Sequence, residues 1–98
     1  MCGIAGYFGI KPPCNSLISR TLGLMKRRGP DHQASKAFTL GNNEIRLLHS
    51  RLSIIDLDSR SNQPFSVGPL TIVFNGEIYN YLELRKGLLS SGVQLLTS

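Results

Sequence analysis

The spacing of apolar and polar residues along the chain predicts a mixed α and β domain. Apolar residues fill 3–10, a stretch of strand length that ends at Lys-Pro-Pro, which is typical of a buried strand. Segment 15–27 carries its apolar residues at helical spacing, which predicts an amphipathic helix with Asn15 or Ser16 as N-cap. The remaining predicted elements are a hairpin of 34–40 and 44–55, a polar loop over 56–69, a strand over 70–75, a helix over 80–92 and a strand that starts at 93–96.

The second predicted helix carries signals at both of its ends. Asn80 and Glu83 have the spacing of a capping box, and Gly92 is a typical residue just past a helix C-terminus. The order of elements, β-α-β-β-β-α-β, predicts an α+β layered domain. Because the last strand starts only a few residues before Ser98, we expect the chain to be a fragment of a longer domain.

Length and composition fit one globular domain. The chain has 98 residues, of which 41% are hydrophobic and 17% are charged. Its net charge of +5 would suit a nucleic-acid-binding protein. However, only Lys26, Arg27 and Arg28 lie together, and no aromatic residues alternate with them to stack on bases. A solvated helix end explains this cluster better, so we expect no nucleic-acid partner.

The sequence contains neither targeting signals nor metal-binding spacings. The apolar start lacks the charged region of a secretory signal, and no stretch has the roughly 18–20 apolar residues of a membrane span. Two cysteines do not make a disulfide framework, and Cys2, Cys14, His32 and His49 lack the paired short spacings of zinc sites. We therefore expect a reduced, cytoplasmic protein with no metal and no membrane partner.

Cys2 is the first candidate for chemistry, because removal of the initiator methionine would make it the N-terminal residue. Its α-amine would then have a pKa of about 7.7–8.0, close to the thiol at about 8.5. A nucleophile and a base would thus share one residue. Taken alone, a small residue that fills space at a strand start is the more common explanation.

Asn75 and Gly76 form the second candidate. A side-chain amide and a neighbouring backbone N–H can converge on one point as an oxyanion hole. Asn-Gly is also a common turn dipeptide, which explains the pair without any chemistry. Glu77 beside them could bind a cationic amine or face water.

Arg51 lies within an apolar run and is the third candidate. Strand alternation places it on one face with His49, and Ser50 on the other. An arginine there would need a partner, and its planar fork suits a carboxylate, although an exposed strand arginine is equally compatible with the pattern. His49 fits a structural role better than a catalytic one, and we interpret the turn at 28–31 as scaffold beside a site.

Five motifs in order closely resemble the glutaminase domain of asparagine synthetases, which are class II glutamine amidotransferases with an N-terminal-nucleophile fold. They are "MCGIAGYFG", "RRGPD", "HSRLSIIDL", "NQPF" and "FNGEIYNYLELR". The resemblance covers essentially all 98 residues. It favours the asparagine synthetase branch over the branches that act on sugar phosphates or phosphoribosyl pyrophosphate.

The resemblance implies a role for each matching residue. Cys2 would be the nucleophile with its α-amine as base, and Arg51 would hold the α-carboxylate of the substrate glutamine. Asn75 and the N–H of Gly76 would hold the oxyanion, and Glu77 would help to bind the α-ammonium group. The implied reaction releases ammonia and leaves a thioester, which water converts to glutamate.

The resemblance also implies what this chain lacks. We expect it to be the first part of a truncated four-layer αββα sandwich over residues 1–98, without the synthetase domain that uses ATP and Mg. No cofactor is expected in this segment, the missing synthetase domain is the expected partner, and the isolated fragment is expected to be inactive. The alternative is a non-catalytic structural or interaction module of the same fold.

Overall fold

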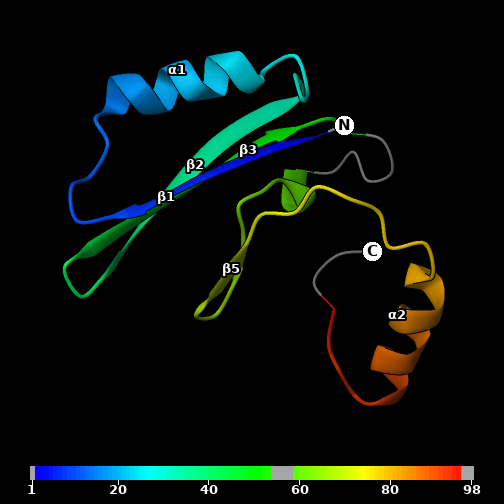
Figure 1. Ribbon diagram of the computed structural model, residues 1–98. Helices are drawn as coiled ribbons and strands as arrows, with labels where there is room; N and C mark the ends of the chain where they lie inside the picture. Colours follow the sequence, from blue (N-terminus) through cyan, green and yellow to red (C-terminus); the bar gives the residue numbers. More distant parts are fainter. Residues whose placement is uncertain (1, 54–58, 96–98) are drawn as a thin grey trace.

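The computed structural model describes residues 2–53 and 59–95 and shows an α+β chain with two helices and antiparallel sheets (Figure 1). Its elements in chain order are β1 (Gly3–Gly9), α1 (Asn15–Met25), β2 (His32–Leu40), β3 (Asn43–Arg51), the 3-10 helix η1 (Ser59–Ser61), β4 (Phe65–Val67), β5 (Leu70–Ile72) and α2 (Tyr81–Ser90). Within these described residues, neither helix is long and apolar enough to cross a membrane.

The larger sheet has the order β1-β3-β2, with β3 in the centre and both pairings antiparallel. The predicted hairpin is confirmed in its pairing, since β2 and β3 pair along their whole length and turn at Gly41, which has a φ of +62°. Its second strand, predicted over 44–55, ends at Arg51, and residues 54–55 lie outside the described residues. Strand β1 pairs with the other edge of β3, so that Gly3 lies opposite Ser50. This pairing brings the start of the chain to the end of β3.

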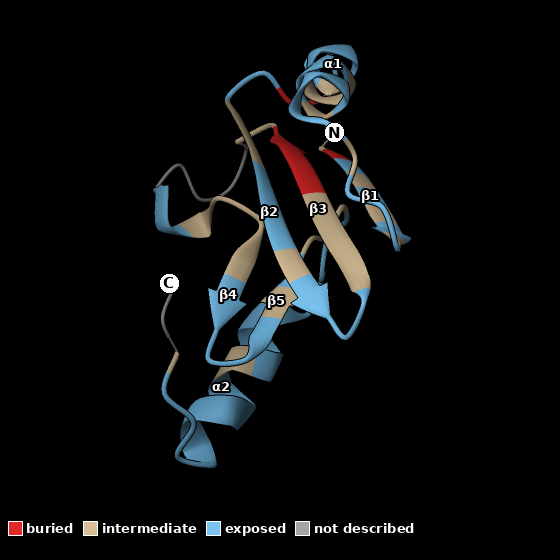
Figure 2. Cartoon of the chain, turned by 90° about the vertical axis from the view of Figure 1, so that its left-hand side faces the viewer, coloured by how far each residue is buried: buried red, intermediate tan, exposed pale blue. Residues whose placement is uncertain are grey.

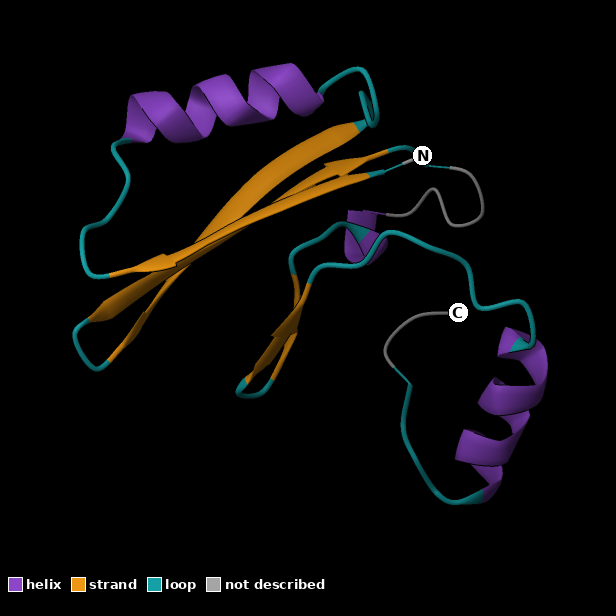
Figure 3. Cartoon of the chain, in the orientation of Figure 1, coloured by secondary structure: helices purple, strands orange, loops and turns teal. Residues whose placement is uncertain are grey.

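Helix α1 covers one face of this sheet, and the β4–β5 hairpin lies on the other side (Figures 1 and 3). The Gln33 side-chain amide on β2 donates to the Leu22 carbonyl of α1 and, over 2.9 Å, to Ser50 Oγ. On the opposite face, Lys36 Nζ donates to Ser66 Oγ of β4 over 2.5 Å. The predicted alternation along β3 is confirmed, because Ser50 faces α1 while His49 faces the side of the hairpin.

Burial is concentrated in the last four residues of β3 (Figure 2). Leu48 is 2% exposed and is the one fully buried large apolar side chain among the described residues. His49 and Ser50 have no exposed surface, and Arg51 retains 7%. By contrast, several large apolar residues of the outer strands are about half exposed or more: Ile4, Phe8, Val67, Leu70 and Ile72.

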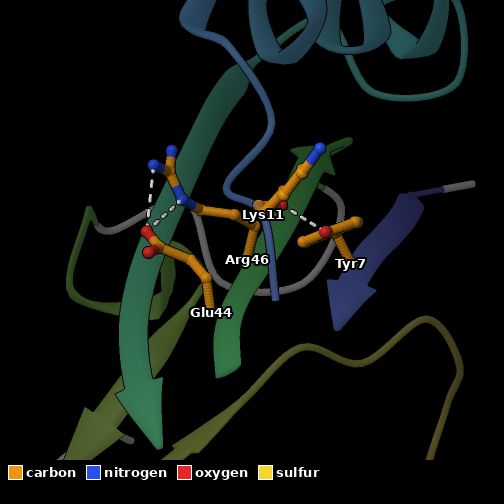
Figure 4. A network of polar contacts seen from close by, with 4 residues as sticks. All are labelled: Tyr7, Lys11, Glu44 and Arg46. Carbon is orange, nitrogen blue, oxygen red and sulfur yellow. Dashed lines mark hydrogen bonds and ion pairs between the residues drawn. The ribbon is translucent and has the colours of Figure 1, made fainter. Parts of the chain in front are cut away.

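At the opposite end of the sheet, the side chains make polar contacts that are exposed or half-buried (Figure 4). The Arg46 guanidinium donates to Glu44 Oε1 from Nε over 3.3 Å and from Nη2 over 3.2 Å. The Tyr7 hydroxyl donates to the Lys11 carbonyl, which ties the end of β1 to the loop before α1. The two ends of β3 are therefore stabilised differently, with the buried end next to the N-terminus.

The strand predicted over 70–75 is wrong in its second half. Strand β5 ends at Ile72, and its three residues pair with β4, which the sequence pattern did not predict. The ladder ends here because the backbone of Phe74 is bound by side chains rather than by a strand.

The helix ends also differ from their predictions. Cys14, not Asn15 or Ser16, is the N-cap of α1, and Asn80 caps α2 without a side-chain hydrogen bond, so the predicted capping box does not form. Gly92 does end α2, with a φ of +84°.

The predicted strand over 93–96 is wrong for residues 93–95, which carry no regular structure. The backbone N–H groups of Gly92 and Val93 donate to Leu89 and Leu88, both over 3.1 Å. This pairing is that of a Schellman motif and uses the N–H of Val93 to close the helix. Leu96 lies outside the described residues.

Candidate active site

Cys2 lies immediately before β1, and its thiol contacts the residue that follows β3. The backbone N–H of Leu52 donates to Cys2 Sγ over 3.4 Å, and the thiol lies 3.8 Å from the Leu52 carbonyl oxygen. The side chain is half-buried, and both Cys2 and Cys14 are free thiols. The antiparallel pairing of β1 with β3 thus places the candidate nucleophile next to Arg51, one residue before Leu52 in the chain.

The turn at 28–31 holds these two strand ends together. Arg28 Nε donates to the Cys2 carbonyl over 3.2 Å, and the Asp31 carboxylate accepts from the Ser53 N–H over 2.7 Å. The N–H of Asp31 also donates to the Arg51 carbonyl over 2.9 Å. The structure places the turn where the sequence indicated, as scaffold against Cys2 and the end of β3.

Gly29 allows this turn to approach β3 so closely. A Cβ atom at Gly29 would lie 2.2 Å from the Ser50 carbonyl oxygen, a distance that no side chain can occupy. Its φ is not positive, so space rather than backbone conformation requires glycine. Ser50 Oγ in turn donates to the Gly29 carbonyl over 2.6 Å, which satisfies a buried acceptor.

Arg51 is buried, which excludes the exposed strand arginine that the sequence left open. Its Nη1 donates to Asn62 Oδ1 over 2.6 Å. It lies on the face of β3 that is directed toward the second sheet, where a planar guanidinium can present donors to a carboxylate.

His49 lies on the same face and is fully buried. Its Nε2 lies 3.4 Å from the Phe74 carbonyl oxygen, so the proton is on Nε2, because a carbonyl only accepts. Its Nδ1 has no hydrogen-bond partner among the described residues. Loss of water by burial, together with the charge of Arg51, lowers the pKa of His49, and the bond to Phe74 opposes this only in part. Burial therefore favours the neutral form of the ring.

Asn75, Gly76 and Glu77 lie in the irregular segment between β5 and α2, which we call the 73–80 segment. Asn75 is half-buried, while Gly76 and Glu77 are exposed. They are connected to β3 through Phe74, whose carbonyl oxygen lies 3.4 Å from His49 Nε2, while its N–H donates to Gln63 Oε1 over 2.6 Å. Among the described residues, no hydrogen bond or ion pair joins these three to Cys2. The structure thus brings Cys2 and Arg51 to neighbouring positions through the pairing of β1 with β3, whereas the 73–80 segment is attached to β3 through Phe74.

Sequence reasoning missed the roles of Asn62 and Gln63, which contact Arg51 and Phe74 respectively. Both lie in a stretch whose polar residues predicted only a loop. Their one signal was membership in the "NQPF" motif, which says nothing of their partners.

Comparison with known proteins identifies related chains. The glutamine amidotransferase domain model matches residues 1–98. A Mycobacterium bovis protein, provisionally named asparagine synthetase (glutamine-hydrolyzing), is 44% identical over 90% of this chain and 16% of its own length. Asparagine synthetase (glutamine-hydrolyzing) of Brassica oleracea is 41% identical over 90% of this chain and 15% of its own. Asparagine synthetase (glutamine-hydrolyzing) 1 of Bacillus subtilis is 36% identical over 94% of this chain and 15% of its own length.

The chain spans about a sixth of the length of these relatives. No solved structure matches it. The resemblance of the five motifs to the glutaminase domain of asparagine synthetases is confirmed by both the family model and the relatives. The chain therefore belongs to the glutamine amidotransferase domain family.

Proposed function

We propose that this chain is the glutamine-hydrolysing part of an asparagine synthetase-like amidotransferase and that Cys2 is its nucleophile. The observation that carries the proposal is the position of Cys2 Sγ, 3.4 Å from the backbone N–H of Leu52 and next in the fold to the buried Arg51. A thiol at the first position of the mature chain, beside a buried cation, is the arrangement that attack on an amino-acid amide needs.

Each proposed step uses groups of this chain. The Cys2 sulfur attacks the side-chain amide carbon of glutamine, while the thiol proton passes to the α-amine that removal of Met1 exposes. The carbon–nitrogen bond then breaks, and the nitrogen leaves as ammonia with that proton. Water next attacks the thioester, which releases glutamate and restores the thiol. These steps need no metal or cofactor.

The substrate is held by its two charged ends in this proposal. Arg51 binds the α-carboxylate, and Glu77 contributes to binding of the α-ammonium group. Asn75 and the N–H of Gly76 stabilise the oxyanion that forms when sulfur attacks, and the loss of one such donor costs about 10²–10³ in rate. Aspartate is the proposed acceptor of the ammonia in a synthetase domain that uses ATP and Mg, because the relatives are asparagine synthetases by name.

The test measures ammonia release from glutamine by the protein as its own cells make it. The intact mass of the same protein establishes which residue is its N-terminus. We expect Met1 to be absent and Cys2→Ala to lower kcat by at least about 10³-fold. Cys14→Ser is the matched control, because this other free thiol is exposed and lies at the start of α1, so its loss leaves the rate unchanged.

Two results would contradict the proposal. Ammonia release at the normal rate with Met1 retained would remove the α-amine from the mechanism. A correctly processed wild-type protein, in the full length that its own cells make, that releases no ammonia would instead favour the non-catalytic module of the same fold.

A further inference from the structure

The backbone of Phe74 is bound on both sides by side chains from elsewhere in the fold. Gln63 Oε1 accepts from its N–H over 2.6 Å, and His49 Nε2 lies 3.4 Å from its carbonyl oxygen. Strand β5 has already ended at Ile72, so no ladder holds Phe74, and its own side chain is 43% exposed. The two polar contacts therefore fix the start of the 73–80 segment.

The residue before Gln63 connects this arrangement to Arg51. Asn62 Oδ1 accepts from Arg51 Nη1 over 2.6 Å, so two consecutive side chains contact two parts of the candidate site. Arg51 and His49 are also two residues apart on one face of β3. The distance between Arg51 and the backbone that leads into Asn75 is thus set by the rigid β3 strand and by the pair Asn62–Gln63.

From this geometry we infer that Gln63 and His49 are positioning residues that place Asn75 and Gly76 at a fixed distance from Arg51. This role rests on the proposed glutamine hydrolysis, in which Arg51 holds one end of the substrate and Asn75 with Gly76 receive the oxyanion near the other. A displacement of about 1 Å at the reacting atoms can cost about 10²-fold in rate. Neither side chain touches the substrate.

The decisive experiment compares two substitutions of Gln63. Gln63→Glu keeps an acceptor oxygen at the same place, whereas Gln63→Met has a similar shape and no acceptor. Hydrogen exchange of the Phe74 amide, followed by NMR, reports the bond directly and requires no activity. We expect the exchange rate to be about 3- to 10-fold higher in Gln63→Met, because the loss of one hydrogen bond changes an opening equilibrium by about this factor. In Gln63→Glu the rate should be close to that of the wild type. Gln94→Met is the matched control, because Gln94 is exposed and in the short stretch after α2.

Kinetics separate positioning from a general loss of structure. In Gln63→Met we expect kcat for glutamine to fall about 10- to 100-fold with KM changed less than about 3-fold, and Gln63→Glu to recover most of the rate. Alkylation of Cys2 by iodoacetamide, which forms no oxyanion, should keep its wild-type rate. His49→Gln retains a side-chain N–H donor and should lose less activity than His49→Leu.

Each other outcome has a definite meaning. Unchanged Phe74 exchange in Gln63→Met, or an equal loss of kcat in the Glu and Met variants, would overturn the positioning role. Slower alkylation of Cys2 in parallel with kcat would assign Gln63 a merely structural role. If the wild-type chain releases no ammonia, the proposed function fails, while exchange at Phe74, Asn75 and Gly76 still decides whether Gln63 holds this segment.

Discussion

At the end of β3, Arg51 is held by a strand ladder and by a turn whose backbone donates to its carbonyl, whereas Asn75 to Glu77 follow a strand that has already ended. In the first region, the ladder, the backbone N–H of Asp31 and the missing side chain of Gly29 set the geometry, and side chains such as that of Asp31 add hydrogen bonds to it. In the second region, it is the side chains of Gln63 and His49 that bind the chain. We call these the strand-end region and the 73–80 segment.

The two halves of the site are therefore sensitive to different kinds of substitution. Backbone contacts resist most side-chain changes but do not tolerate a new atom at the point of closest approach. Side-chain contacts can be removed one at a time and leave the rest of the fold in place. Apart from Arg51, which the proposed function assigns to the substrate, the strand-end region should therefore respond to mutation through stability, and the 73–80 segment mainly through activity.

The largest expected effect comes from adding one methyl group in each region. Gly29→Ala places a Cβ 2.2 Å from the backbone oxygen of Ser50, so the turn or β3 must move, and we expect a loss of about 3 kcal/mol in unfolding free energy. Gly76→Ala meets the ring of Phe74 at 2.8 Å, but this is the tip of a half-exposed side chain that can rotate away. We expect a loss below about 1 kcal/mol there.

Urea unfolding of the two alanine variants provides the measurement. Gly87→Ala serves as a further control, because nothing lies within 4 Å of its Cβ and it is inside α2, where alanine should stabilise by about 0.5–1 kcal/mol. Equal losses for Gly29→Ala and Gly76→Ala would mean that the two regions are held with similar tightness, contrary to the comparison.

A smaller effect is expected from the pH dependence of His49, which lies between the two regions. Burial lowers its pKa in the folded chain below its ordinary value of 6.5, so in the window between these two values the unfolded chain binds more protons. The contribution of His49 to stability therefore falls as the pH drops below about 6.5. It stops changing once the pH is below the pKa of His49 in the folded chain. One proton contributes at most about 1.4 kcal/mol per pH unit.

Unfolding measured over this pH window in wild type and His49→Gln isolates the contribution. The glutamine variant cannot take up the proton, so its stability should change less with pH. His32 and Arg51, which also face this ring and disfavour its charge, remain in both proteins. Identical slopes in the two proteins would show that His49 titrates normally when folded.

The strand-end region was largely predictable from the sequence, because local signals determine it. Periodicity indicated β1, α1 and the β2–β3 hairpin, and alternation put Ser50 and His49 on opposite faces, as observed. The burial of Arg51 could not be predicted from periodicity or alternation. Its contact with Asn62 comes from a loop 11 residues further along the chain.

The 73–80 segment was harder to predict because its conformation depends on long-range contacts. Val73 and Phe74 are apolar and continue the pattern of β5, so they were expected in the strand. The backbone of Phe74 is instead bound by Gln63 and His49, 11 and 25 residues away in sequence. No local pattern distinguishes a residue bound by a ladder from one bound by two side chains.

The smallest expected effect concerns the exposed contact between the two sheets. Lys36 Nζ donates to Ser66 Oγ over 2.5 Å and lies 5.4 Å from the centre of the Phe38 ring, but both hydrogen-bond partners are exposed. In Lys36→Met we expect a loss below about 0.5 kcal/mol, similar to the control Lys86→Met on α2. Exchange of the Phe74 amide should not change.

This last substitution sharpens the comparison by asking what attaches the 73–80 segment to the first sheet. If Asn62, Gln63 and His49 provide the attachment, then loosening β4 from β2 at Lys36 leaves Phe74 protected. If Lys36→Met instead accelerates exchange at Phe74 as much as Gln63→Met does, the segment is held through the β4–β5 hairpin as a whole. The two side-chain contacts to Phe74 would then follow from hairpin docking and would not set the position of Asn75.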